Sequence, residues 1–173
     1  IRFGNVERMQ RSAAGLMMRL GSRSRTTLLG RLASAAADLR DLRIPRALSA
    51  LDALRRERPR DPEVLQLLGE AHLLAGQPDA ALAAFQALDG VVGGAPRARF
   101  GIVRALLAMR DGPGARRAIE GLLSVSPHHP GGLLERARLA WQEDRDATQA
   151  VGLARQVLEF AARASDAELA RAH

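Results

Sequence analysis

Two adjacent histidines, in the segment Ser126-Pro127-His128-His129-Pro130, are the side chains best suited to bind a metal ion or move a proton. Imidazole is a common metal ligand and general base. Adjacent side chains point in different directions, however, and no third ligand lies nearby in the sequence, whereas a zinc site needs at least three protein ligands. The pattern therefore favours a role in a loop or at the entry to a helix over a metal site.

Motifs for enzymatic chemistry are missing from the sequence. It has no cysteine, no G-x-S-x-G, no G-x-x-x-x-G-K and no H-E-x-x-H, so serine hydrolase, nucleotide-loop and zinc-protease chemistry lack their minimum parts. His72, Glu70, Glu135 and Asp144 stand at ordinary helix positions. We therefore predict that the chain is not an enzyme and binds no cofactor or metal.

The composition indicates which type of secondary structure carries the functional side chains. The chain has 173 residues, 47% of them hydrophobic but only 3% aromatic, and no apolar run approaches the 18 residues of a membrane span. An interior of Leu, Ala and Val favours close-packed helices over a sheet sandwich. We expect an all-α protein without a transmembrane segment.

Positive charge is concentrated in the first third of the chain. Residues 1–60 hold 14 of the 26 arginines but only 5 of the 19 acidic residues, and there is no lysine. Such a region attracts nucleic acid, an anionic membrane surface or an acidic protein. Solvated helix faces are the favoured interpretation, nucleic acid is the less favoured one, and peripheral membrane contact is left open.

The positions that hold these residues follow a 34-residue period. Alanines recur at Ala47, Ala81 and Ala115, and a proline stands two or three residues before each. Four and seven residues after each alanine come larger apolar side chains: Leu51, Phe85 and Ile119, then Leu54, Leu88 and Leu122. A period of this length predicts an array of helix pairs, with proline in the first turn of each second helix.

The period divides the chain into units. We predict an amphipathic helix with a basic linker over residues 1–27, four units over 28–61, 62–95, 96–129 and 130–164, and the start of a further or capping helix over 165–173. The last boundary comes from Ser165-Asp166-Ala167-Glu168, which has the form of a capping box. In the fourth unit the small residue is displaced to Ala150, which implies a one-residue insertion.

Within this frame the sequence resembles the tetratricopeptide repeat (TPR) family, as found in bacterial TPR-containing proteins. Leu68-Gly69, Ala81, Phe85 and Leu88 have the spacing of that repeat, and Pro59 and Pro127 occupy its closing proline position. The resemblance implies a right-handed α-solenoid of stacked antiparallel helix pairs, with about four TPR units, an N-terminal helix and a C-terminal capping helix. It also implies a concave groove, lined by the first helix of each unit, that binds a peptide or protein segment.

The groove positions of the family can be mapped onto this sequence. The first unit contributes Leu32, Ala36 and Leu39. The later units contribute Gln66, Glu70, Leu73, Arg97, Phe100, Arg104, Leu107, Leu134, Arg138 and Trp141. The later part combines three arginines with two aromatic rings, which suits an acidic or C-terminal peptide with an apolar anchor. Core packing of Phe100 and Trp141 is the alternative. The family's carboxylate clamp for chaperone tails is disfavoured, because only Arg97 matches it.

We therefore predict a non-enzymatic scaffold for protein–protein interaction, part of a larger bacterial protein or complex, with a protein or peptide partner. Two alternatives are a basic adaptor that contacts nucleic acid or anionic membrane through the Arg-rich first third, and an accessory TPR domain of a secretion, polysaccharide-export or transferase protein. The cytoplasm is favoured over the periplasm, because residues 1–20 lack the pattern of a signal peptide. The partner's identity and the oligomeric state are left open.

Overall fold

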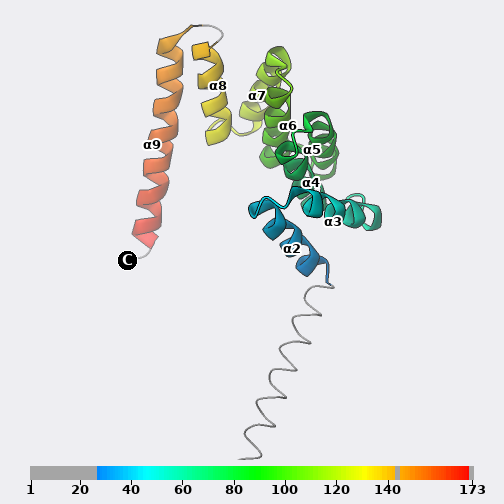
Figure 1. Cartoon of the computed structure of the whole chain (residues 1–173). Helices are drawn as coiled ribbons and strands as arrows, with labels where there is room; N and C mark the ends of the chain where they lie inside the picture. Colours follow the sequence, from blue (N-terminus) through cyan, green and yellow to red (C-terminus); the bar gives the residue numbers. More distant parts are fainter. Residues whose placement is uncertain (1–26, 143–144, 172–173) are drawn as a thin grey trace, which may run out of the picture.

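The computed structural model describes residues 27–142 and 145–171, and this part of the chain forms eight α-helices and no strand. The all-α fold predicted from the sequence is confirmed. The helices are α2 (Leu28–Arg40), α3 (Ile44–Glu57), α4 (Pro62–Leu74), α5 (Pro78–Val92), α6 (Pro96–Ala108), α7 (Gly112–Val125), α8 (Pro130–Gln142) and α9 (Ala147–Arg171). They follow one another around an arch, with α2 near one end and α9 at the other (Figure 1).

The helices form four pairs, which we call units one to four. Their first helices begin at Leu28, Pro62, Pro96 and Pro130, each 34 residues after the one before, and each has 13 residues. Proline suits these starts because the first N–H groups of a helix have no partner within it. At α4 the carboxylate of Asp61 also accepts hydrogen bonds from the Glu63 and Val64 amides, at 3.1 and 3.2 Å.

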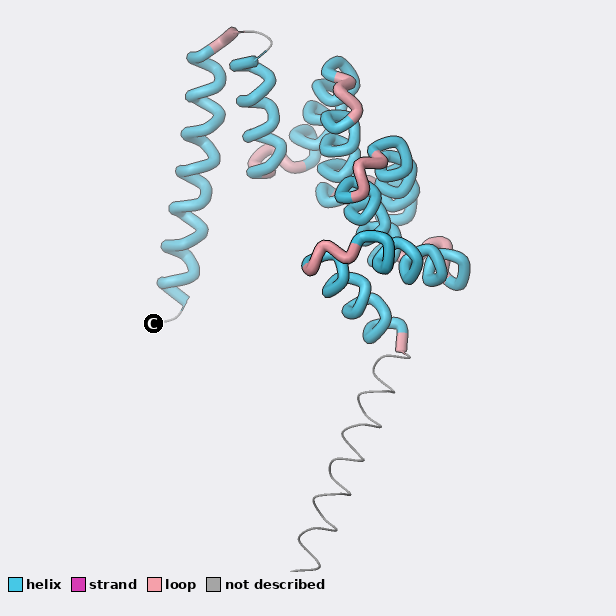
Figure 2. Tube along the Cα trace, in the orientation of Figure 1, coloured by secondary structure: helices cyan, strands magenta, loops and turns pink. Residues whose placement is uncertain are grey.

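The turn inside each unit contains one residue with a positive φ. These residues are Leu42, Gly76 and Arg110, spaced by 34, and then Arg145, spaced by 35. The additional residue of unit four therefore lies in the turn between α8 and α9, consistent with the displacement of the small residue to Ala150. Figure 2 shows how short the connections within units one to three are.

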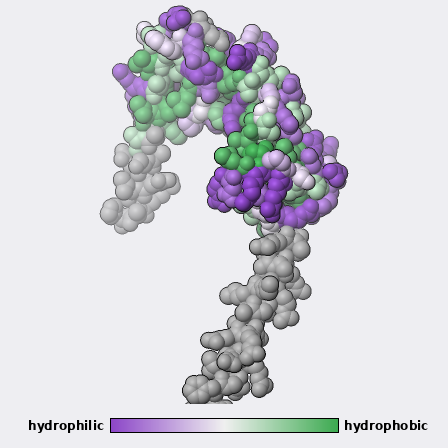
Figure 3. All heavy atoms as spheres, in the orientation of Figure 1, coloured by the Kyte–Doolittle hydropathy of each residue, from purple (hydrophilic) through white to green (hydrophobic). Residues whose placement is uncertain are grey.

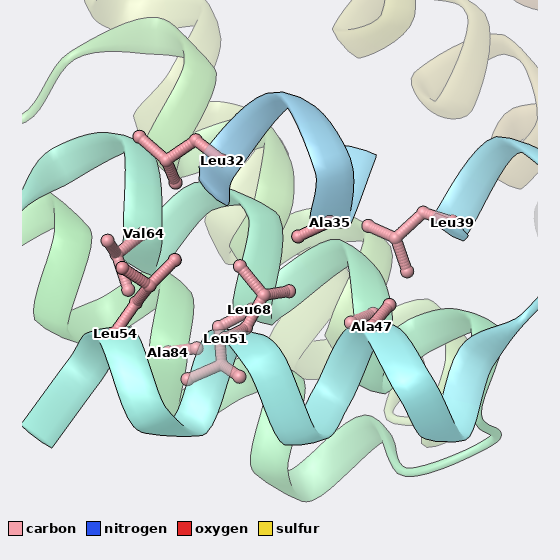
Figure 4. Packing of buried hydrophobic residues seen from close by; sticks show 10 residues of the cluster. Leu32, Ala35, Leu39, Ala47, Leu51, Leu54, Val64, Leu68 and Ala84 are labelled. Atoms are coloured by element: carbon pink, nitrogen blue, oxygen red, sulfur yellow. The ribbon is translucent and has the colours of Figure 1, made fainter. Parts of the chain in front are cut away.

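The core follows the same period. Ala47, Ala81 and Ala115 are completely buried, because each lies where a second helix crosses its neighbours. Around Ala47, leucines from α2, α3 and α4 form one continuous cluster that joins units one and two (Figure 4). No unit buries its apolar face alone, so each depends on its neighbours, as in other repeat arrays.

The curvature of the arch determines which helices face inward. The first helices contact one another from unit to unit, α2 with α4, α4 with α6 and α6 with α8. Over the described residues, no Cα atom of a second helix comes within 8 Å of one in the second helix of the next unit, so the second helices are spaced more widely than the first helices. The first helices therefore lie on the inner, concave side, and the second helices spread on the outer side.

The structure corrects one predicted boundary. Helix α9 continues without a break from Ala147 to Arg171, so Ser165 lies inside it and does not begin a separate helix. No proline or glycine stands between Gly152 and Arg171, so nothing in the sequence stops the helix there. The predicted helix and linker over residues 1–27 lie outside the described residues, except for Thr27, whose hydroxyl caps α2 by accepting from the Gly30 amide at 3.1 Å.

Candidate partner-binding groove

The predicted groove residues fall into three rows, with one residue from each first helix at 34-residue spacing. They are the first row Leu32, Gln66, Phe100 and Leu134; the second row Ala36, Glu70, Arg104 and Arg138; and the third row Leu39, Leu73, Leu107 and Trp141. These rows contain every predicted groove residue except Arg97. In the first and third rows, side-chain exposure increases from unit one to unit four. Leu32 and Leu39 are buried, whereas Leu134 and Trp141 are 50% and 56% exposed.

In the first half of the groove, the predicted polar residues bind one another or their neighbours. The Gln66 amide nitrogen donates to Glu70 at 2.7 Å. Arg97 donates to Glu63 at 2.8 Å, and both side chains are about half exposed. Glu63 was missed by the sequence analysis, although it stands one repeat length before Arg97. Arg97 therefore joins units two and three and is not an isolated positive charge.

Phe100 lies at the junction between units three and four. It is half-buried and packs beside Val103, Ile119, Leu122 and Leu139. Its ring centroid is 4.9 Å from that of His129. Gly131 of α8 faces the same ring, and a Cβ there would overlap it. One side of the Phe100 ring thus packs against its neighbours, while part of the side chain is still exposed.

The second half of the groove holds the most accessible charges and rings. Arg104 is exposed and forms no ion pair with another described residue. Arg138 donates to Glu135 at 2.8 Å and to Gln142 at 2.7 Å, so its charge is partly neutralised. Leu73 and Leu107 are half-buried against the cores of the units that carry them. Figure 3 shows apolar surface over the end of the arch that α8 and α9 form.

The two adjacent histidines have structural contacts. The Gly132 amide donates to Nδ1 of His129 at 3.1 Å, so His129 caps the entry to α8. Burial lowers the pKa of His129 below its ordinary value. His128 stacks on Phe160 of α9, with ring centroids 5.8 Å apart. Within residues 27–142 and 145–171, no three His, Asp or Glu side chains are grouped to hold a metal ion.

Helix pairs stacked at a constant period around a groove lined by first helices define an α-solenoid of helical repeats. The model of the tetratricopeptide repeat family matches residues 31–96 and 100–171, and the chain belongs to that family. The structure is similar to that of MamA, with a TM-score of 0.69, 16% identity, and coverage of 96% of this chain and 98% of that one. It is also similar to MamA residues 41-end from Desulfovibrio magneticus RS-1, with a TM-score of 0.67, 16% identity, and coverage of 78% and 75%.

At this identity the MamA structures are evidence for the fold alone. No curated protein matches the sequence closely enough to count as a relative. Family membership and fold support a scaffold for protein interaction in general, of the kind that TPR proteins provide without catalysis. Among the described helices, none is long and apolar enough to cross a membrane.

Proposed function

We propose that this chain is a scaffold whose concave groove holds an acidic peptide segment with an apolar anchor, in units three and four. One observation carries the proposal. Arg104 and Trp141 are both exposed on neighbouring first helices, and Arg104 has no carboxylate partner among the described residues. Trp and Arg are the residue types that contribute most to protein interfaces, through apolar burial and through hydrogen bonds to carboxylates.

The contrast with units one and two favours the later half of the groove. There Leu32 and Leu39 are buried, the Gln66 amide nitrogen is bound to Glu70, and Ala36 and Leu73 are half-buried. A peptide in that half would find fewer exposed side chains to contact. A peptide in units three and four would gain a partner for Arg104 and would cover the Trp141 ring.

The position of Trp141 also supplies a direct assay, because it is the only tryptophan of the chain. Short blocked peptides made of Asp, Glu and one Leu or Phe are titrated into the protein while its tryptophan fluorescence is followed. We expect Arg104→Gln to weaken binding about tenfold, or about 1.4 kcal/mol. We expect Trp141→Ala, measured by calorimetry, to weaken it by about 2 kcal/mol or more.

The matched control is Arg110→Gln, which removes an exposed arginine from the turn after the same helix. It leaves the groove rows intact, so binding should not change. Equal affinity of the wild type and the Arg104→Gln and Trp141→Ala variants would refute the proposal, provided that circular dichroism shows the same helix content.

The two alternatives from the sequence are still predictions. A basic adaptor would act through the Arg-rich first third of the chain, of which residues 27–60 are described and residues 1–26 are not. An accessory TPR domain of a secretion, polysaccharide-export or transferase protein would use the same groove, so the peptide assay addresses its binding site and not its context.

A further inference from the structure

Two pockets, one in unit two and one in unit four, share two lining positions of the repeat. The pocket of unit two has a volume of about 570 Å³ and is lined in part by Pro59, Arg60 and Leu65. The pocket of unit four has a volume of about 470 Å³ and is lined in part by Pro127 and Leu133. The two prolines are two repeat lengths apart, and so are the two leucines. No residue of the three groove rows lines either pocket.

Unit three holds an arginine where units two and four hold these leucines. Arg99 stands one repeat after Leu65 and one repeat before Leu133. Its Nη1 donates to the carbonyl oxygen of Gly121 on α7 at 2.6 Å, and its Nε lies 3.9 Å from Asp89 on α5. A Cβ at Gly94 would lie only 2.7 Å from its Nη2. The Arg99 side chain thus occupies, in unit three, the space that is open in units two and four.

The open pockets combine an apolar wall with an accessible positive charge. Arg60 lines the pocket of unit two and Arg136 that of unit four. Both are exposed, and neither forms an ion pair with another described residue, whereas Arg99 is bound within its own unit. Glutamines complete the polar part, Gln86 in unit two and Gln149 with Gln156 in unit four.

We propose that the pockets of units two and four each take one apolar side chain of an acidic protein partner, with a neighbouring Asp or Glu bound by Arg60 or Arg136. Complementary charge determines this choice. A basic segment would be repelled by each arginine, and a neutral apolar one would leave the guanidinium without a partner. These sites differ from the groove in their position, because no residue of the three groove rows lines either of them.

Glycines in the pocket walls allow each site to be filled without damage to the fold. Gly90 lines the pocket of unit two and Gly152 that of unit four. A Cβ at either position would meet nothing within 4 Å. Both lie inside helices, where replacing glycine by a better helix former stabilises the helix by up to about 1 kcal/mol. Gly90→Met and Gly152→Met therefore place a side chain at each pocket and retain the fold.

The matched control is Gly121→Met in unit three. A Cβ at Gly121 also meets nothing within 4 Å, but Arg99 already occupies the equivalent space in that unit. The probe is a blocked acidic peptide with a single leucine, titrated by calorimetry in an Arg104→Gln, Trp141→Ala background that disables the groove. We expect two sites in the background protein and with Gly121→Met, one with either Gly90→Met or Gly152→Met, and none with both.

The charge requirement is tested separately. Arg60→Gln and Arg136→Gln together should weaken binding about tenfold, as should a peptide with Asn and Gln in place of its acidic residues. The proposal is overturned if the background protein does not bind the peptide. It is also overturned if filling the two pockets leaves the stoichiometry unchanged, or if Gly121→Met removes as much binding as the other two variants.

Discussion

The junction between units two and three and the junction between units three and four each pack an aromatic ring against glycine, but on different helices. At the first junction the ring is Phe85, on the second helix of its unit, and it is completely buried against Gly69 and Gly101. At the second junction the ring is Phe100, on a first helix, and it stays half-buried against Gly131. The Phe85 ring is enclosed between helices, whereas the Phe100 ring is partly exposed.

Apolar side chains are also more exposed in unit four than at the centre of the array. Unit four carries more exposed large apolar side chains than any other described unit: Leu134, Trp141, Val151, Leu158 and Phe160. Local stability depends on buried apolar contacts, so unit four should open at a lower free energy than the centre. The least enclosed packing of the described array therefore lies in unit four, which also carries Arg138 and Trp141.

Replacing the glycines that face the two aromatic rings should have the largest effect on stability. A Cβ at Gly101 would overlap the Phe85 ring, which has no open space to move into. We expect Gly101→Ala to lower the free energy of unfolding by about 1–3 kcal/mol, the usual cost of overpacking a core. Chemical denaturation followed by circular dichroism measures this loss.

Two further variants control that result. Gly131→Ala should cost less, because the half-buried Phe100 ring can shift toward the groove. In the Gly101→Ala background, Phe85→Leu should recover part of the loss, since the smaller side chain removes the overlap. An equal loss of unfolding free energy in Gly101→Ala and Gly131→Ala would mean that the two junctions are equally rigid. That result would contradict the difference in burial between the two rings.

The sequence predicted the fold more fully than the contacts between units. Burial of Ala47, Ala81 and Ala115 follows from local periodicity, which is visible in a single chain. The pair between Arg97 and Glu63 depends on the angle between successive units, which the period does not determine. The packing of Phe100 on Gly131 depends on the same angle. At Ser165 a local capping pattern gave the wrong boundary, because capping residues favour a helix start but do not interrupt a helix already formed.

The turns allow the stability of each region to be changed separately. Arg110 in unit three and Arg145 in unit four have φ values of 60° and 54°, in the left-handed region that favours glycine. We expect Arg110→Gly and Arg145→Gly each to stabilise the protein by about 1 kcal/mol, because left-handed backbone costs other residues about 1–2 kcal/mol. Gly76→Ala, at the equivalent turn with open space around it, should destabilise by a similar amount.

Two probes separate the regions in this experiment. The fluorescence of Trp141 reports on α8, whereas circular dichroism reports on all helices. If unit four opens first, Arg145→Gly raises the fluorescence midpoint more than the dichroism midpoint, and Arg110→Gly does the reverse. Identical shifts of both midpoints in both variants would show that the array unfolds as one unit and would contradict the difference between the junctions.

The smallest expected effect is a pH dependence confined to the junction of units three and four. The pKa of His129 is lowered from 6.5 by burial, so the folded protein binds its proton less readily than the unfolded chain. The stability from neutral His129 is present above pH 6.5 and is lost as the pH falls from 6.5 through the lowered folded pKa. Protonation also removes the Nδ1 acceptor of the Gly132 amide. We expect the Trp141 fluorescence midpoint of unfolding to fall over this range by more than in His129→Asn, which retains a capping oxygen but does not titrate. The same pH dependence in wild type and His129→Asn would assign the effect to other groups.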